Sequence, residues 1–104
     1  MPKREYAVTV DSAATKRMCL HVRFLAQVSV LAAERLYDAL EKAIDSLKHN
    51  PTICPPYIAK FPTETELRYK LCAKRYRIVF EIIDKAVYVY DIQDCRQDTD
   101  KNLV

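Results

Sequence analysis

Glycine and tryptophan are both missing from this sequence of 104 residues. Without glycine, the chain has none of the glycine-rich loops that hold phosphate groups in nucleotide-binding proteins. It also lacks paired catalytic carboxylates, an H-E-x-x-H helix and a nucleophile elbow. If the protein is an enzyme, its chemistry must therefore depend on cationic side chains.

Long hydrophobic runs are missing as well. The first residues lead directly into an alternating pattern, without the apolar stretch of a signal peptide. No other stretch is long enough to span a bilayer. We therefore expect a soluble cytoplasmic protein that does not contact membranes.

The sequence contains no metal-binding or redox motif. Its four cysteines, Cys19, Cys54, Cys72 and Cys95, are widely scattered and form no C-x-x-C pair. We expect reduced thiols that act as small apolar residues, and no metal or cofactor. The two histidines fall in or at the end of predicted helices, so we expect structural roles for His21 and His49.

Size and charge are those of one small globular protein. We expect a single domain over residues 1–104, because shorter pieces would bury too little apolar surface. The net charge of +3, from 17 basic and 14 acidic residues, does not by itself indicate nucleic acid. The cations are concentrated, however: residues 68–77 include five basic side chains and no acidic one.

The N-terminal half predicts a strand followed by a helical hairpin. Alternation predicts a strand over 6–10, and apolar spacing predicts a helix over 13–26, capped by Asp11 or Ser12. In this helix Leu20 and Phe24 widen the apolar stripe beyond one contact surface, which suggests a partner there. Ser29 is expected to cap a second helix that ends at His49-Asn50-Pro51.

The C-terminal half predicts three antiparallel strands. Four prolines between residues 51 and 62 favour an irregular crossing, and strands are expected over 67–72, 76–83 and 87–92. The fold class is therefore α+β, with the helices on one face of the sheet. Residues 96–104 are polar and are expected to fray.

Strand alternation also predicts a basic surface. If the helices cover the face of Tyr69, Ile78 and Phe80, the opposite face must present cations that suit phosphate oxygens. These are Arg68, Lys70 and Arg77, joined by Arg96 after the last strand. Tyr88 or Tyr90, whichever faces outward, would supply a ring for base stacking, whereas Lys74 and Arg75 are assigned to a turn.

The chain resembles the RelE/ParE superfamily of type II toxin–antitoxin toxins. The similarity rests on the order β-α-α-β-β-β and on the segments Leu67–Leu71, Tyr76–Ile82, Val87–Val89 and Cys95-Arg96-Gln97-Asp98. It implies a toxin whose partner is an antitoxin that wraps around it, in a toxin–antitoxin hetero-oligomer. The stripe at Leu20 and Phe24 is the place we expect the antitoxin to contact.

RelE-like members imply a metal-free ribonuclease that cuts ribosome-bound messenger RNA. The resemblance then assigns catalysis to Lys70 as base or anchor of the attacking 2′-hydroxyl. Arg77 and Arg68, and more loosely Arg96, would stabilise charge on the phosphate.

ParE-like members imply a different target, DNA gyrase, on the same fold. Residues 97–104 contain neither the tyrosine nor the histidine that RelE-like ribonucleases have after their last arginine. The sequence alone favours the ribonuclease narrowly. A gyrase-directed toxin and an inactive member that only binds its antitoxin remain the alternatives.

Overall fold

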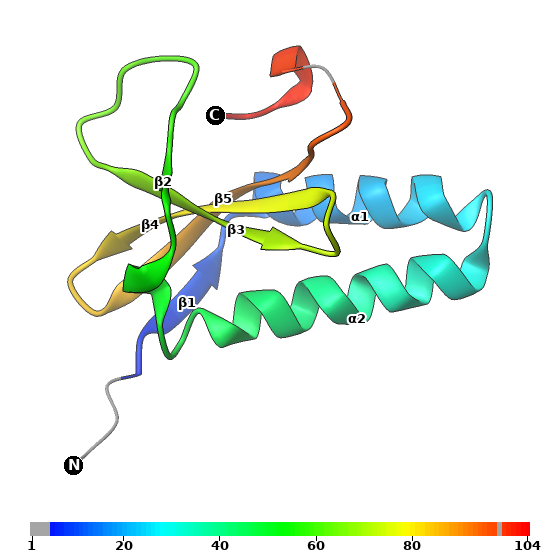
Figure 1. The fold of residues 1–104 in the computed structure, drawn as a ribbon, viewed down its shortest axis with the longest axis horizontal. Coiled ribbons are helices and arrows are strands. Elements are labelled where there is room, and N and C mark those ends of the chain that lie inside the picture. The colour runs from blue at the N-terminus through cyan, green and yellow to red at the C-terminus, as the bar shows by residue number, and fades with distance from the viewer. Residues whose placement is uncertain (1–4, 98) are drawn as a thin grey trace.

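The protein folds as a five-stranded sheet with a helical hairpin against one face (Figure 1). The computed structural model describes residues 5–97 and 99–104. Its elements are β1 (Ala7–Val10), α1 (Ser12–Ala26), α2 (Val30–Ser46), η1 (Pro51–Ile53), β2 (Pro56–Tyr57), β3 (Leu67–Cys72), β4 (Tyr76–Ile83), β5 (Ala86–Asp94) and η2 (Thr99–Lys101). This order confirms the predicted α+β class. Asp98, the last residue of the closing motif, and residues 1–4 lie outside the described residues.

Both helices begin at the predicted polar caps. The Asp11 side chain accepts a hydrogen bond from the backbone N–H of Ala13 at 3.2 Å, which selects Asp11 over Ser12 as the cap of α1. Ser29 Oγ accepts from the N–H of Ala32 at 3.1 Å. Each bond satisfies an amide that has no partner within its helix, so the chain is fixed where it enters each helix.

The sheet has five strands and not the predicted three, in the order β1-β5-β4-β3-β2. β1 lies parallel to β5, with Ala7 opposite Ala86, and β2 pairs with the start of β3. The antiparallel pairing of β3, β4 and β5 is as predicted. The sequence predicted β1 as a strand but not its place in this sheet, because its partner lies almost eighty residues away, and it missed β2, which has only two residues.

The hydrophobic core lies between the helical hairpin and one face of the sheet, here called the helix-covered face. Leu40 of α2, Ile78 and Phe80 of β4 and Val89 of β5 all have 0% of their surface exposed. Burying these side chains is the main favourable contribution to folding. The opposite side of the sheet is called the outer face below.

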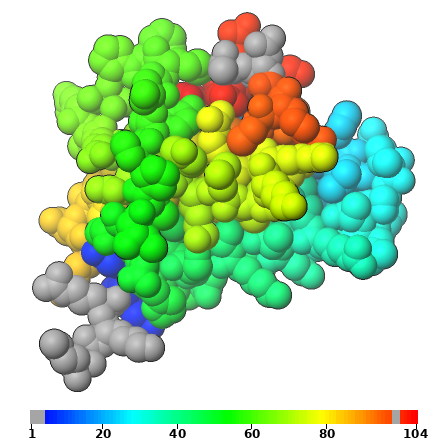
Figure 2. Space-filling model, viewed as in Figure 1, coloured from blue at the N-terminus to red at the C-terminus, as the bar shows by residue number. Residues whose placement is uncertain are grey.

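The C-terminal residues pack on the protein, whereas fraying was expected. The backbone N–H of Leu103 donates to Asp91 on β5 at 2.8 Å, and Tyr57 donates to the carbonyl oxygen of Val104 at 2.8 Å. Lys60 also donates to the carbonyl of Asn102, so the β2–β3 loop and the C-terminal residues lie side by side (Figure 2). Fraying was predicted from polar composition alone. That prediction is wrong because the backbone groups of these residues form hydrogen bonds with polar side chains of the folded protein.

Among the described residues, no helix combines the length and apolar character needed to cross a membrane. No three His, Cys, Asp or Glu side chains in this part of the chain are grouped so that they could hold a metal ion.

Candidate functional site

The β3–β4 hairpin divides the predicted cations between the two faces of the sheet. Lys70 lies opposite Ile78, whereas Arg77 lies opposite Leu71. Directly opposed residues of an antiparallel pair project from the same face. Lys70, and Arg68 two residues before it, therefore belong to the helix-covered face, and Arg77 belongs to the outer face. The prediction that these three share one open surface is wrong.

The length of the β3–β4 turn explains this error. Three residues, 73–75, separate Cys72 from its partner Tyr76, so even-numbered residues of β3 face even-numbered residues of β4. The predicted apolar row combined odd residues of the first strand with even residues of the second. Because side chains alternate along a strand, one extra residue in the turn exchanges the two faces.

Arg68 is engaged by the crossing segment that precedes β3. Its guanidinium donates to the carbonyl oxygens of Cys54 at 2.7 Å and Thr52 at 3.1 Å, and it lies 3.8 Å from a carboxylate oxygen of Glu66. These bonds use donors that a phosphate would need. Arg68 thus ties η1 and the following residues to the sheet.

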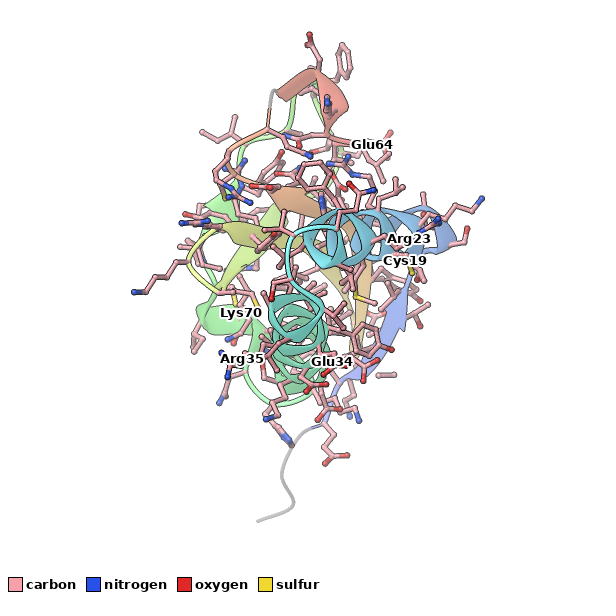
Figure 3. The ribbon with its side chains drawn as sticks, turned by 90° about the vertical axis from the view of Figure 1, so that its right-hand side faces the viewer. Cys19, Arg23, Glu34, Arg35, Glu64 and Lys70 are labelled. Atoms are coloured by element: carbon pink, nitrogen blue, oxygen red, sulfur yellow. The ribbon has the colours of Figure 1, made fainter. Side chains whose placement is uncertain are left out.

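Lys70, which is labelled in Figure 3, lies near the buried thiols of Cys54 and Cys72. Burial raises the pKa of Cys54 and of Cys72, and the positive charge of Lys70 opposes part of that rise. Both thiols therefore stay protonated at neutral pH. The prediction of free thiols is confirmed for all four cysteines.

Arg77 lies among polar side chains of the outer face. Its guanidinium carbon is 5.7 Å from the centre of the Tyr57 ring, and Gln93 is its cross-strand partner on β5. The Nε atom is buried and has no hydrogen-bond partner among the described residues. Arg77 is thus partly buried among its neighbours, with its Nε atom shielded from solvent.

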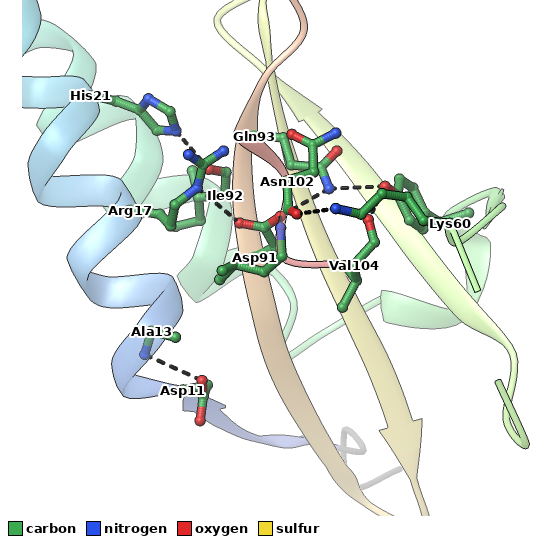
Figure 4. Close-up of polar contacts among 12 residues, drawn as sticks. Asp11, Ala13, Arg17, His21, Lys60, Asp91, Ile92, Gln93, Asn102 and Val104 are labelled. Atoms are coloured by element: carbon green, nitrogen blue, oxygen red, sulfur yellow. Dashed lines mark hydrogen bonds and ion pairs between the residues drawn. The ribbon is translucent and has the colours of Figure 1, made fainter. Parts of the chain in front are cut away.

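Asp91 is the centre of a buried polar network on the outer face (Figure 4). It has 0% exposure and lies 3.3 Å from Arg17 of α1. It also accepts hydrogen bonds from Gln93 at 2.9 Å and from the N–H of Leu103 at 2.8 Å. Asp91 therefore connects the first helix to the C-terminal residues. This role was not predictable from the sequence, because Arg17 lies 74 residues away along the chain and Leu103 belongs to a segment expected to fray.

Arg96, the fourth predicted cation, is paired with a carboxylate. Its Nε and Nη2 atoms donate to the two oxygens of Asp94 at 3.1 and 3.0 Å, and its backbone N–H donates to the same group. Burial works to raise the pKa of Asp94, but these bonds outweigh it and the net pKa is lowered. Much of the charge of Arg96 is therefore neutralised within the protein.

The two candidate stacking tyrosines lie near Glu81 on the outer face. Tyr88 is the cross-strand partner of Glu81, and Tyr90 occupies the irregular position where the β4–β5 register shifts. Tyr90 donates to Glu81 at 2.7 Å, and Thr65 donates to the other carboxylate oxygen. Burial and this bond to Glu81 raise the pKa of Tyr90 to about 12. At neutral pH the Tyr90 hydroxyl is therefore protonated and keeps its hydrogen bond to Glu81.

His21 has the structural position expected for it. It is 5% exposed, its ring centre lies 5.5 Å from that of Tyr76 with the two rings tilted by 59°, and its Nε2 donates to the carbonyl oxygen of Ile92 at 2.6 Å. Burial lowers its pKa below the ordinary 6.5. A neutral His21 therefore links α1 to β5.

The apolar stripe of α1 and the cations of the β3–β4 turn are open to solvent. Leu20 and Phe24 on α1 are 57% and 68% exposed, so the expected apolar stripe is present at the surface. What covers it stays a prediction. Lys74 and Arg75, which the sequence assigned to a turn and passed over, line a cavity beside α2.

Comparison with known proteins identifies the family. A family profile described as the ParE toxin of type II toxin-antitoxin system, parDE, matches residues 8–99. No curated protein matches the sequence significantly. The profile extends from β1 to the start of η2, and the family implies an antitoxin as partner. The chain therefore belongs to the ParE toxin family of type II toxin–antitoxin systems, within the RelE/ParE superfamily.

Proposed function

We propose that this toxin acts in the cytoplasm by binding and inhibiting DNA gyrase, and that it does not cut messenger RNA. The separation of Lys70 and Arg77 onto opposite faces carries the proposal. A ribonuclease would need both cations at one phosphate, because catalysis by electrostatic stabilisation requires donors placed around the reacting group.

The engagement of the other two cations also supports binding over cleavage. Arg68 donates to two carbonyl oxygens, and Arg96 donates to both oxygens of Asp94. Neither can turn to a phosphate without breaking these bonds. The ParE profile points to the gyrase alternative as well, since gyrase is the target that ParE-like members imply. These observations reverse the preference drawn from the sequence alone.

A supercoiling assay with purified gyrase tests the proposal. We expect micromolar toxin to inhibit supercoiling of relaxed plasmid, and Lys70→Ala to inhibit as strongly as the wild type. Lys70→Ala is the informative variant because Lys70 is only partly buried and forms no ion pair with another described residue.

Mapping of transcript ends in cells tests the ribonuclease alternative. Growth arrest with intact transcripts is expected on induction of the toxin alone. New cleavage sites that disappear with Lys70→Ala would refute the proposal and support the ribonuclease alternative. Normal growth together with uninhibited gyrase would identify the chain as an inactive antitoxin-binding member.

A further inference from the structure

A groove lies on the side of the helical hairpin next to β1. Its volume is about 490 Å³. The apolar part of its lining comes from β1 and from both helices: Val8, Val10, Met18 and Ile44. β1 is an edge strand of the sheet, and an edge strand has backbone groups that can accept a partner. This side of the hairpin therefore combines an apolar groove with an open sheet edge.

Each helix presents two exposed charges of one sign on its surface. Lys16 and Arg23 belong to α1, which contains no acidic residue, and Glu34 and Glu41 belong to α2. Within each helix the two charges are separated by about two turns, so they lie on the same face. None of the four forms an ion pair with another described residue. The charges of both helices are therefore available to a partner.

These charges lie on one side of the hairpin. Figure 3 shows Arg23 of α1 and Glu34 of α2 on the side away from Lys70. Glu41 is itself part of the lining of the groove. We call this surface, with the groove and the residues Lys16, Cys19, Arg23, Glu34, Tyr37 and Glu41, the hairpin flank.

Tyr37 and Cys19 lie at the middle of the hairpin flank. Each is three positions after the first charge of its helix and four positions before the second. Tyr37 is 42% exposed. A hydrogen bond with Glu41 and the charge of that carboxylate raise the pKa of Tyr37, and Cys19 acts on it in the same direction. The two residues therefore lie near each other where α1 passes α2.

The arrangement of the charges decides which kind of partner fits. Nucleic acids and anionic membranes would be repelled by the carboxylates of Glu34 and Glu41. A complementary surface needs carboxylates opposite α1 and cations opposite α2, both at the spacing found here. The hairpin flank itself has this pattern when it is turned through 180°.

A two-fold axis perpendicular to the hairpin flank brings the pattern into register. The two helices run antiparallel (Figure 1), so the rotation places α2 of a second copy along α1 of the first, in the same direction. Lys16 then faces Glu34 of the second copy, and Arg23 faces Glu41 of the second copy. Each pair occurs twice, because both copies use the same surface. All four charges of each flank are thereby matched with charges of opposite sign.

We propose that two copies of the toxin form a dimer through their hairpin flanks, with the Lys16–Glu34 and Arg23–Glu41 pairs around a centre that contains Tyr37. Burial of apolar surface supplies the affinity, and the ion pairs fix the orientation of the two copies. The inference concerns the toxin in the absence of other proteins, and it does not depend on gyrase as the target.

A charge exchange between two variants tests this arrangement. Lys16→Glu/Arg23→Glu and Glu34→Lys/Glu41→Lys each place like charges opposite one another in their own dimers. Each should raise the dissociation constant of the dimer at least about 10-fold, and more at low salt than at high salt. An equimolar mixture of the two should associate nearly as tightly as the wild type, because every pair then has opposite charges again. Sedimentation equilibrium of the purified full-length toxin measures all of these constants.

The controls reverse charges of the same two kinds outside the hairpin flank. Lys85→Glu lies in the β4–β5 turn and Glu64→Lys in the β2–β3 loop, both at exposed positions. Both should dimerise as the wild type does. Arg23→Gln removes one charge without reversing it and should raise the dissociation constant about 3- to 10-fold at unchanged melting temperature, so the test does not depend on the folding of the double variants.

Several outcomes would overturn the dimer. These are a wild type that stays monomeric at high micromolar concentration, wild-type dimerisation of Arg23→Gln, and a mixture of folded double variants that does not associate. A monomeric toxin whose flank variants lose gyrase inhibition or antitoxin binding would assign the surface to that partner, and would also refute the proposal. A dimer with the expected charge dependence and no effect on gyrase would support the hairpin flank while refuting the proposed target.

Discussion

The two faces of the sheet are stabilised in different ways. The helix-covered face buries a cluster of apolar side chains, including Ile78, Phe80 and Val89, each at 0% exposure. The outer face instead buries Asp91 and Gln93, which are also at 0% exposure and depend on hydrogen bonds to distant segments. Apolar packing is not directional, whereas a buried charge needs each of its partners in place. Truncating apolar side chains on the helix-covered face should therefore lower the free energy of unfolding in proportion to the surface that is lost. On the outer face, removing a single hydrogen-bond partner should already lower it measurably.

The largest expected effect is on the helix-covered face. Phe80→Ala should lower the free energy of unfolding by about 3–5 kcal/mol, because a fully buried ring is replaced by a cavity. Urea denaturation measures the loss. Ile83→Ala, on the same strand but 44% exposed, is the control and should lose less than about 1.5 kcal/mol. Equal losses would contradict a core confined to that face.

Removing the central carboxylate tests the outer face. Asp91→Ala should cost about 3 kcal/mol, because it leaves the Arg17 guanidinium, 13% exposed, without its carboxylate. The exposed Asp45 provides the control, and Asp45→Ala should leave the denaturation midpoint nearly unchanged. A loss at Asp91 as small as that at Asp45 would show that the network contributes little.

A single hydrogen bond from the C-terminal residues should have a smaller but measurable effect. Leu103→Pro removes the N–H that donates to Asp91 and is expected to cost about 2 kcal/mol, since bonds to charged groups are worth about 1.5–3 kcal/mol. Leu103→Ala keeps that N–H and should be milder. If both variants unfold at the same urea concentration, the C-terminal residues are not anchored through the bond from Leu103 to Asp91.

Acid should produce the smallest effect, through His21. Its folded-state pKa is below 6.5, so the unfolded chain binds the proton more readily. Stability is therefore complete above pH 6.5 and falls as the pH decreases from there toward the folded-state pKa. Melting temperatures between pH 7 and pH 5 should decline less for His21→Gln than for the wild type. His49→Gln, at an exposed position, should decline as the wild type does.

Local patterns in the sequence were sufficient for both helices and for four of the five strands. Helical spacing and the caps Asp11 and Ser29 predicted the hairpin, and alternation predicted β3, β4 and β5. Each of these signals acts between residues a few positions apart. The packing of Phe80 and Tyr76 in the core followed from the same patterns.

The candidate site was not predictable in the same way, because it depends on register. Whether Lys70 and Arg77 share a face is decided by one residue in the turn, which hydrophobic alternation on either side does not specify. The position of Arg77 beside the Tyr57 ring, and the pairing of Arg96 with Asp94, are contacts that composition cannot reveal. Lys74 and Arg75 were passed over because turn residues are usually solvated.

The parallel pairing of β1 with β5 has a consequence for the order of events during synthesis. β1 leaves the ribosome first, yet its partner strand starts only at Ala86. The nascent chain therefore exposes Val8 and Val10 without a strand beside them until most of the sequence has been translated. Such distant contacts slow folding. The toxin completes its sheet only after its last strand is made, which gives a cell an interval in which an antitoxin already present can meet the chain before it is fully folded.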